Sequence, residues 1–407
     1  MYLTFAWRYF KAKKSANAIN IIAWVTVGVI AFATACQILV LSVFNGFEDL
    51  VKSLYSSFYT DIKIIPTRGK TFTLTPTQLN SIKQQAGISA VSMIAEEKAL
   101  LQNEGMQTIV FLKGVDENYK LVSGVAGKIV EGKFNTGNAA DPGLIVGAGI
   151  QNATALYVDR NLGSSELTII LPKKGKVSAS DPMQSLSEGN VIATGIFTIQ
   201  QDFDNKYAIT NIDFVKQQMG FAPNEYSAAE IRLGAQADML KMQKELSQLL
   251  GDNYTVQTKY QQNTSLYNTM RLEKWAIYAV LTLILLIAAF NMISALTMLV
   301  LEKQKDISVL QSMGADKPMI LKIFLSEGVL LGGIGAISGI LMALVICLLQ
   351  VKFHLIKLQG GSFLIDYFPV KLQATDFLLV SSTVALIAFL ASWFPARKAS
   401  GQLIELR

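Results

Sequence analysis

The sequence is short of charge, cysteine and histidine, and each shortage excludes a class of protein. Only 16% of its 407 residues are charged, against about 25% in an average globular protein, which excludes an ordinary soluble chain. Neither of its two cysteines lies between residues 48 and 274, so a disulfide-held domain is excluded there. The one histidine, His354, has no second histidine or cysteine nearby, which leaves no metal-ligand cluster.

Catalytic motifs are missing as well. The sequence contains no G-x-x-x-x-G-K-[ST], no G-x-S-x-G, no H-E-x-x-H and no C-x-x-C. We therefore expect a chain that is not an enzyme, with no catalytic residues, no metal and no cofactor of its own. The net charge of +6 does not indicate nucleic acid, because residues 48–274 hold 22 Lys/Arg and 23 Asp/Glu and the positive excess flanks the apolar runs.

Four long apolar runs are present instead. Each is free of charge for long enough to cross about 30 Å of hydrocarbon, which takes roughly 20 helical residues. They cover residues 15–47, 275–301, 328–351 and 377–396. The first continues past Cys36, where a removable signal would end, so we expect it to stay in the chain. The prediction is an α-helical integral membrane protein with four transmembrane helices and a large α+β domain between helices 1 and 2.

The distribution of basic residues predicts the orientation. The N-terminus, the loop at 302–322 and the C-terminus together carry eleven Lys/Arg, while the short loop at 351–376 carries three. Because basic residues collect on the cytoplasmic side, we expect both termini to be cytoplasmic and the large domain to lie outside. The expected segments are, in order, a cytoplasmic segment 1–19, helix 20–45, the outer domain 46–273, helix 274–301, a cytoplasmic loop 302–318, helix 319–350, an outer loop 351–375, helix 376–395 and a cytoplasmic tail 396–407.

Inside the outer domain, short β-branched runs alternate with helical stretches. Strands are expected at 108–115, 166–171, 191–197 and 229–233, and helices at 75–85 and 240–250. Between two of the strands, Pro172 to Gly189 forms a long polar stretch rich in Gly, Pro and Ser. Loops of this length are either functional or disordered, and the sequence does not separate the two.

The loop at 302–318 contains one short amphipathic helix. Apolar residues recur at Ile307, Leu310 and Met313, Gly314 ends the helix, and Asp316 with Pro318 begins the next. Such a helix lies either on a partner protein or on lipid headgroups. In the third apolar run, Gly328, Gly332, Gly335 and Gly339 are spaced for close approach to a neighbouring helix.

Several strings resemble a known family. Phe290-Asn291-Met292-Ile293-Ser294, Met313-Gly314-Ala315 and Phe324-Leu325-Ser326-Glu327-Gly328 resemble the FtsX/MacB-type ABC permeases. Asn45-Gly46-Phe47-Glu48 is similar to the lipoprotein-releasing (Lol) branch of that family. The resemblance covers the whole chain, and only the tail departs from it, where Gln402 and Leu403 replace a usual proline-containing stretch.

The resemblance implies a MacB-like periplasmic domain and a permease of the LolC/LolE type in the bacterial inner membrane. It implies two copies of a LolD-like cytoplasmic ATPase, which would bind ATP and Mg, and a second permease, either LolC/LolE-like or another copy of this chain. It further implies a LolA-like periplasmic carrier, lipoprotein substrates and contact with membrane lipids. Two alternatives stay open: an efflux or FtsX-like permease with a separate ATPase, and a protein that transmits force without transport.

The resemblance also assigns roles to two sets of residues, and place in the sequence predicts a role for a third. Coupling to the ATPase is expected of Glu302, Lys303, Asp306, Ile307, Leu310, Met313 and Gly314. From their places toward the outer halves of the first two apolar runs, eight further residues are expected either to line an acyl-chain cavity or to face lipid, and spacing does not separate the two: Phe32, Leu39, Val43, Phe44, Phe47, Ile277, Val280 and Leu281. A hook for the carrier is expected at Lys174, Pro182, Met183 and Leu186, within the 172–189 stretch.

Overall fold

The computed structural model describes residues 17–159, 163–175, 185–358 and 365–401. The chain forms two compact units. A helical unit comprises Met1–Leu50 with Asn268–Arg407, and an α+β unit comprises Val51–Tyr267. The second unit is thus inserted in sequence between the first and second long helices of the first.

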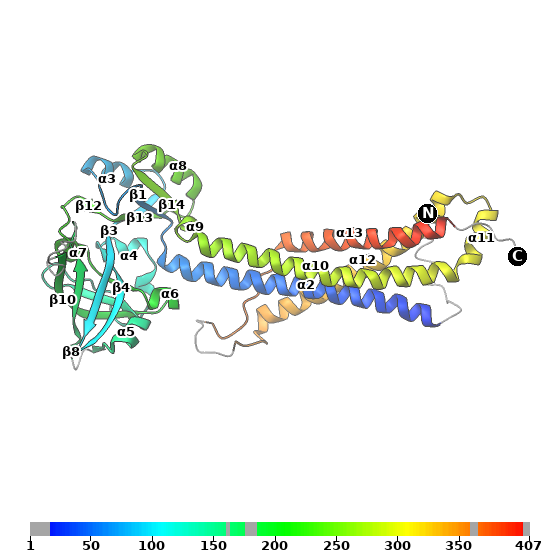
Figure 1. The fold of residues 1–407 in the computed structure, drawn as a ribbon, viewed down its shortest axis with the longest axis horizontal. Coiled ribbons are helices and arrows are strands. Elements are labelled where there is room, and N and C mark those ends of the chain that lie inside the picture. Colours follow the sequence, from blue (N-terminus) through cyan, green and yellow to red (C-terminus); the bar gives the residue numbers. More distant parts are fainter. Residues whose placement is uncertain (1–16, 160–162, 176–184, 359–364, 402–407) are drawn as a thin grey trace. The chain divides into compact units, whose positions relative to one another are not determined.

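The helical unit is built from long helices that run side by side (Figure 1). Four helices of the described residues are long and apolar enough to cross a membrane, which confirms the four predicted apolar segments. They are α2 (Asn17–Phe58), α10 (Thr264–Glu302), α12 (Lys317–Phe353) and α13 (Ala374–Ser400), and the short α11 (Gln304–Ser312) follows α10.

Two of these helices are longer than their apolar cores. The helix α2 continues to Phe58, beyond the expected end at residue 45, and α10 begins at Thr264 rather than at residue 274. A charge-free run identifies only the part of a helix that can lie in hydrocarbon. The helical hydrogen bonds of α2 and α10 continue beyond that part, into sequence that contains charged residues. The unit boundaries accordingly fall inside both helices.

The glycines of α12 pack against two different helices. A Cβ on Gly328 or Gly332 would lie 2.5 Å from the Cβ of Ser392 or Ala388, both on α13. A Cβ on Gly339 would lie 2.4 Å from the carbonyl oxygen of Ala31 on α2. The predicted close approach is therefore present, and it holds α12 between α2 and α13 of the same chain.

The α+β unit is organised around one large sheet. Its described strands form a ten-stranded sheet in the order β14-β1-β13-β3-β4-β11-β6-β10-β5, with β9 paired to β10 and β3. Two small sheets pair β12 with β2 and β7 with β8. The strands are β1 (Ile62–Pro66), β2 (Phe72–Thr73), β3 (Ile88–Asn103), β4 (Met106–Val115), β5 (Ile129–Gly132), β6 (Gly143–Gly147), β7 (Val158–Asp159), β8 (Gly163–Ser164), β9 (Glu166–Pro172), β10 (Leu186–Phe197), β11 (Tyr207–Asn211), β12 (Glu225–Tyr226), β13 (Ala228–Leu233) and β14 (Tyr254–Thr258).

Short helices cover the sheet. They are α3 (Pro76–Lys83), α4 (Tyr119–Val122), the 3-10 turn η1 (Val125–Lys128), α5 (Ala148–Thr154), α6 (Gln201–Asp204), α7 (Ile212–Met219), α8 (Met239–Leu250) and α9 (Lys259–Gln262). Thr75 caps α3 with a capping box, and Asp238 caps α8. All strands and helices predicted for this domain are present within a few residues of their expected bounds.

Alternate strand residues build two cores, one on each face of the sheet. Leu144 and Val146 belong to the larger core, and Ile145 between them belongs to the smaller one. This period of two is what a strand buried on both faces requires. The smaller core also holds Tyr55 and Phe58 from the last turns of α2.

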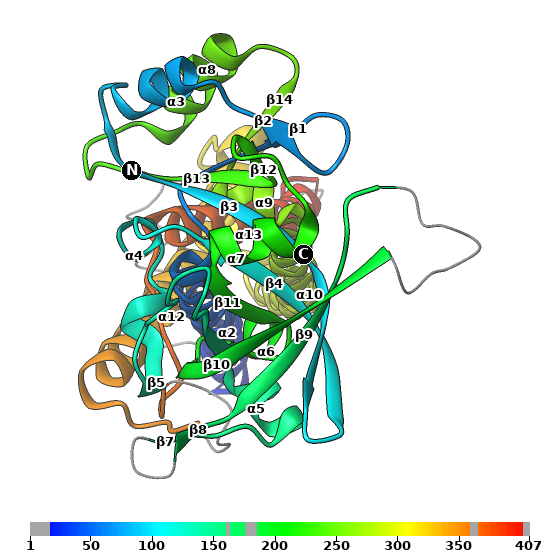
Figure 2. The same ribbon diagram turned by 90° about the vertical axis from the view of Figure 1, so that its left-hand side faces the viewer.

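The expected loop from Pro172 to Gly189 is partly wrong. Strand β10 begins at Leu186, which pairs with Pro172 at the end of β9, so residues 186–189 belong to the ladder. Figure 2 shows β9 and β10 side by side as a hairpin. Polar residues and Gly189 give these positions a composition typical of a loop. A Cβ added to Gly189 would lie 2.8 Å from the Phe214 ring, so the glycine is required there by packing and not by a turn.

Candidate functional site

One end of the helical unit, called here the Asp376 end, is closed by a buried polar network. Asn45 on α2 donates from Nδ2 to an Asp376 carboxylate oxygen on α13 and accepts at Oδ1 from Lys274 Nζ on α10, at 2.8 Å. Lys274 Nζ also lies 3.2 Å from the other Asp376 oxygen. Three residues from three helices thus bond to one another, and Asp376 sits in the first turn of its helix, where the dipole favours a carboxylate.

The residues after Asn45 hold the segment that leads into α13. A Cβ on Gly46 would lie 2.2 Å from the Pro369 carbonyl oxygen, so only glycine allows this approach. The Phe47 ring packs edge-on against Phe368, with centroids 5.8 Å apart. Lys371 pairs with Asp49 at the surface. The Asn-Gly-Phe string is therefore a contact site between α2 and the chain preceding α13.

A pocket of about 300 Å³ opens beside the network. It is lined mainly by apolar side chains with Lys274 and Asp376 at one side, and its lining consists of Leu41, Lys274, Trp275, Tyr278, Thr375, Asp376 and Leu379. None of the eight residues expected to line an acyl cavity belongs to it. Phe32 and Val280 are exposed on the surface of the single chain, and the other six are half-buried. The acyl cavity therefore stays a prediction.

The opposite end, called here the α11 end, is closed by apolar contacts. Ile307 is only 2% exposed and packs in a cluster with Leu299, Ile320 and Phe324. Its own chain thus covers Ile307, which the spacing of apolar residues alone does not show, and the role of Ile307 in coupling to an ATPase stays a prediction. Ile307 attaches α11 to α10, α12 and α13 of its own chain.

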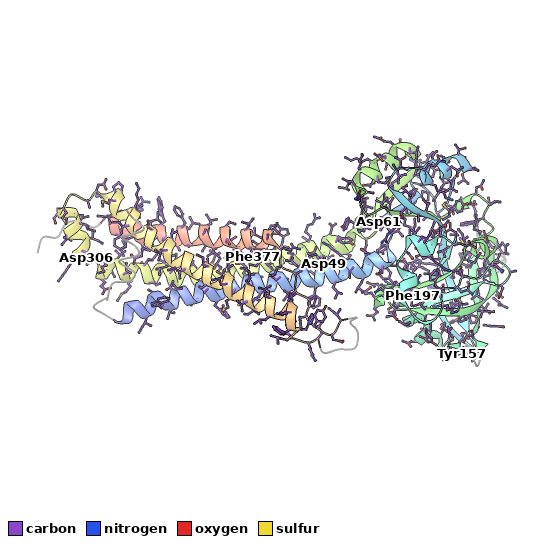
Figure 3. The ribbon with its side chains drawn as sticks, turned by 180° about the vertical axis from the view of Figure 1, so that it is seen from behind. Asp49, Asp61, Tyr157, Phe197, Asp306 and Phe377 are labelled. Carbon is purple, nitrogen blue, oxygen red and sulfur yellow. The ribbon has the colours of Figure 1, made fainter. Side chains whose placement is uncertain are left out.

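The rest of α11 presents a different surface. Met313 is 79% exposed, Val309 is exposed and Leu310 is half-buried. Lys303 forms an ion pair with Asp306 at 2.9 Å, and Glu302 ends α10 beside it. Gly314 has a φ of +92° and ends the helix, as predicted. Figure 3 marks the two ends of the helical unit by Asp306 and Asp49.

The base of the β9–β10 hairpin is held by an ion pair. Lys174 Nζ lies 2.5 Å from Glu225 Oε1, and Thr71 donates to the same carboxylate. Burial favours the protonated carboxyl group, but these two hydrogen bonds outweigh it and lower the pKa of Glu225. Lys174 is thus paired within the domain while its side chain stays about half exposed, and its expected role in steering a carrier stays a prediction. Leu186 is exposed, while Pro182 and Met183 lie outside the described residues.

A second buried ion pair lies under the last turn of α2. Lys113 on β4 and Glu230 on β13 are 2.7 Å apart, and the Lys113 ammonium lies 4.9 Å from the ring centroids of Phe58 and Tyr119. Burial favours the neutral amine, yet the Glu230 carboxylate outweighs burial and raises the pKa of Lys113. The charged lysine fixes the Phe58 ring, and with it the end of α2, on the sheet.

The sequence did carry a signal for the network at the Asp376 end. Lys274 and Asp376 are each the last charge before an apolar run, on the same predicted side of the membrane. Opposite charges at matching depth are natural partners, although the choice of Asn45 as their bridge requires the fold. Among the described residues, no group of three or more His, Cys, Asp or Glu is placed to hold a metal ion.

Comparisons with known proteins match both units. Residues 23–249 match the family model of the MacB-like periplasmic core domain, and residues 278–404 match that of the FtsX-like permease C-terminal region. The lipoprotein-releasing system transmembrane protein LolC of Neisseria meningitidis serogroup B is 27% identical, covering 97% of this chain and 95% of that protein. The corresponding LolE of Haemophilus influenzae is 24% identical, covering 97% and 96%. The periplasmic region of MacB from Actinobacillus actinomycetemcomitans aligns with 54% of this chain at 13% identity and a TM-score of 0.36.

Proposed function

Since the chain belongs to the family of the MacB-like periplasmic core domain, we propose that it is the permease subunit of an ABC transporter that releases lipoproteins from the membrane. The chain is a multi-pass membrane protein with a periplasmic domain, and as a permease subunit it performs no catalysis itself. The observation that carries the proposal is similarity to both LolC and LolE along 97% of the chain, which includes both units.

We infer the following arrangement. The protein lies in the bacterial inner membrane with both termini and α11 in the cytoplasm, and with the Asp376 end facing the periplasm. A second permease, LolC-like, LolE-like or another copy of this chain, completes the pathway, and two copies of a LolD-like ATPase bind ATP and Mg. The bias of basic residues toward the α11 side supports this orientation.

In this mechanism the ATPase acts on α11. Closure of the ATPase pair is a rigid-body motion, and α11 offers the exposed Met313 and Val309 as contacts. Because Ile307 attaches α11 to the ends of α10, α12 and α13, a displacement of α11 moves those three helix ends. The helix α2 itself continues past residue 50 into the α+β unit, where Tyr55 and Phe58 belong to the smaller core.

The cargo would leave from the outer leaflet. An acyl chain needs an apolar surface that excludes water, and both Phe32 and Val280 offer exposed apolar surface that a second permease would enclose. Delivery to a LolA-like carrier is the step that follows. The hairpin end beyond Lys174 remains our candidate for carrier contact, with Leu186 as its described exposed residue.

Depletion of the protein in its own host tests the proposal. We expect lipoproteins destined for the outer membrane to accumulate in the inner-membrane fraction, and the native gene to restore their distribution. The variant Met313→Glu is the matched comparison, because it keeps the folded chain and places a charge at the proposed ATPase contact. An unchanged lipoprotein distribution, with a drug-sensitivity or cell-division phenotype instead, would favour efflux or signalling and reject lipoprotein release.

A further inference from the structure

The short segment after α12 has a conformation fixed by one buried glutamine. Gln350 donates from Nε2 to the carbonyl oxygens of Ile356 and Phe368, at 3.0 and 3.1 Å, and accepts at Oε1 from the Ile356 amide at 2.9 Å. His354 ends the helix in the left-handed region, with a φ of 48°. Phe368 also donates its amide to the Ile356 carbonyl at 3.1 Å. These hydrogen bonds therefore give the backbone of this segment a defined conformation.

This fixed backbone turns large apolar side chains outward. Phe353 is 58% exposed, Leu355 65% and Ile356 57%. Water contact with three such side chains is unfavourable, and nothing in their own described segment covers them. The patch is continuous with the exposed apolar face of α12, on which Val345 and Leu348 lie, and α12 is one of the four membrane-crossing helices.

Two lysines flank the patch. Lys352 and Lys357 are both exposed, and the Lys352 ammonium lies 5.5 Å from the Phe353 ring centroid. Apolar side chains between lysines are typical of segments that lie in a membrane interface, where the chains enter the acyl region and the ammonium groups meet headgroup phosphates. We propose that residues 353–357 insert into the outer leaflet beside α12 and anchor this end of the permease in the lipid. The inference rests on the proposed orientation, which puts residues 351–375 on the periplasmic side.

The anchor is connected to the polar network. Gln350 ties the inserted segment to Phe368, the Phe368 ring packs on Phe47, and Pro369 seats against Gly46, next to Asn45. A change in the depth of the segment therefore reaches α2 at the residue that bridges Lys274 and Asp376. The outer leaflet would thereby be linked, through this series of contacts, to the helix ends at the Asp376 end.

The test measures lipid contact of the full chain in nanodiscs of phosphatidylcholine and phosphatidylglycerol. In a background of Cys36→Ser with Cys347→Ala, single cysteines replace Leu355 or Ile356 and carry an environment-sensitive fluorophore. Ile109→Cys, an exposed apolar position of the α+β unit, is the matched control. We expect lipids with a nitroxide near the headgroup to remove most of the fluorescence at positions 355 and 356 and to leave position 109 unchanged. Unquenched labels at 355 and 356 would overturn the proposal.

A second measurement needs no change to the native cysteines. A photo-crosslinking p-benzoylphenylalanine incorporated at the position of Ile356 should give a phospholipid adduct that is identified by mass. Crosslinks to protein alone would show that another segment or subunit covers the patch and would likewise overturn the proposal. Neither readout uses substrate, ATPase or carrier, so both can fail while lipoprotein release stands, and lipoprotein release can fail while both succeed.

Discussion

The two ends of the helical unit are closed by different kinds of contact. At the α11 end, Ile307 packs with apolar side chains of three other helices, and such contacts are non-directional and permit sliding. At the Asp376 end, Asn45 and Lys274 surround one carboxylate with directional, charge-assisted bonds. The difference predicts that the Asp376 end resists motion until its polar bonds rearrange, and it fits the proposal that a partner moves the α11 end.

The largest effect should come from unpairing the carboxylate. In Lys274→Met the Asp376 side chain, only 8% exposed, keeps the Asn45 amide but loses its cation. Removing one partner of a buried ion pair costs roughly 3–5 kcal/mol, and partial exposure of Lys274 places the expected loss of unfolding free energy at the lower limit of that range. Chemical unfolding of the purified protein in detergent measures it.

The control for this prediction replaces both partners. Lys274→Met with Asp376→Leu removes the charge together with its cation, so most of the lost stability should return. A single Lys274→Met variant as stable as the native protein would contradict the difference between the two ends.

An effect of comparable size separates two residues of α11. Ile307→Ala should lower the free energy of unfolding by about 2–5 kcal/mol, because it leaves a cavity in the apolar cluster. Met313→Ala should change stability by less than about 0.5 kcal/mol, since its side chain lies in solvent. Its effect should appear in the affinity for the ATPase, with a loss of about 2 kcal/mol if it is a central anchor.

Unfolding and ATPase co-purification, measured on both variants, test this separation. We expect Ile307→Ala to lower mainly the stability and Met313→Ala to lower mainly the binding of the ATPase. If Met313→Ala destabilised the chain while leaving ATPase binding intact, α11 would be an internal helix and not a contact for the ATPase.

The packing between the two ends gives the next effect. In Gly339→Ala the new Cβ would meet the Ala31 carbonyl at 2.4 Å, so α2 and α12 must separate, at a cost of about 1–3 kcal/mol. Gly333→Ala is the matched control on the same helix, because nothing lies within 4 Å of its Cβ. It should be neutral or stabilising by up to about 1 kcal/mol through helix propensity. Equal thermal midpoints for the two variants would refute the close contact.

The smallest effect concerns a second charge pair at the Asp376 end, which is more exposed than the pair of Lys274 and Asp376. Lys371 and Asp49 are about half exposed, and water and salt screen their attraction. A double-mutant cycle with Lys371→Met and Asp49→Asn should give a coupling below about 1 kcal/mol that declines further at high salt. A coupling as large as that of Lys274 with Asp376 would mean that burial does not distinguish the two pairs.

The helices and several strands could be predicted from the sequence, because they are determined by residues close together along the chain. Long charge-free runs identified the four helices, β-branched runs identified strands such as β9 and β13, and Gly314 and Asp316 marked a helix end and a helix start. Each of these signals depends on neighbours along the chain. Such local signals can be recognised without knowledge of which distant residues the fold brings together.

The network and the role of Ile307 could not be predicted in the same way. Asn45 bonds to residues that are 229 and 331 positions away, and only the packing of three helices brings them together. Ile307 carries a correct amphipathic signal, but the fold decides that its own chain covers it. The ion pair of Lys174 could not be predicted either, because its partner Glu225 follows 51 residues later.

The central claim is that this chain, with a separate ATPase, releases lipid-anchored proteins from a membrane. It is tested most directly in proteoliposomes that contain the purified complex of this permease with its co-purified subunits, a tri-acylated lipoprotein and a soluble carrier outside. The account predicts that lipoprotein appears in the carrier fraction only with ATP and Mg, and that Met313→Glu reduces this transfer. Lipoprotein that stays in the liposomes, although the complex hydrolyses ATP, would contradict the claim.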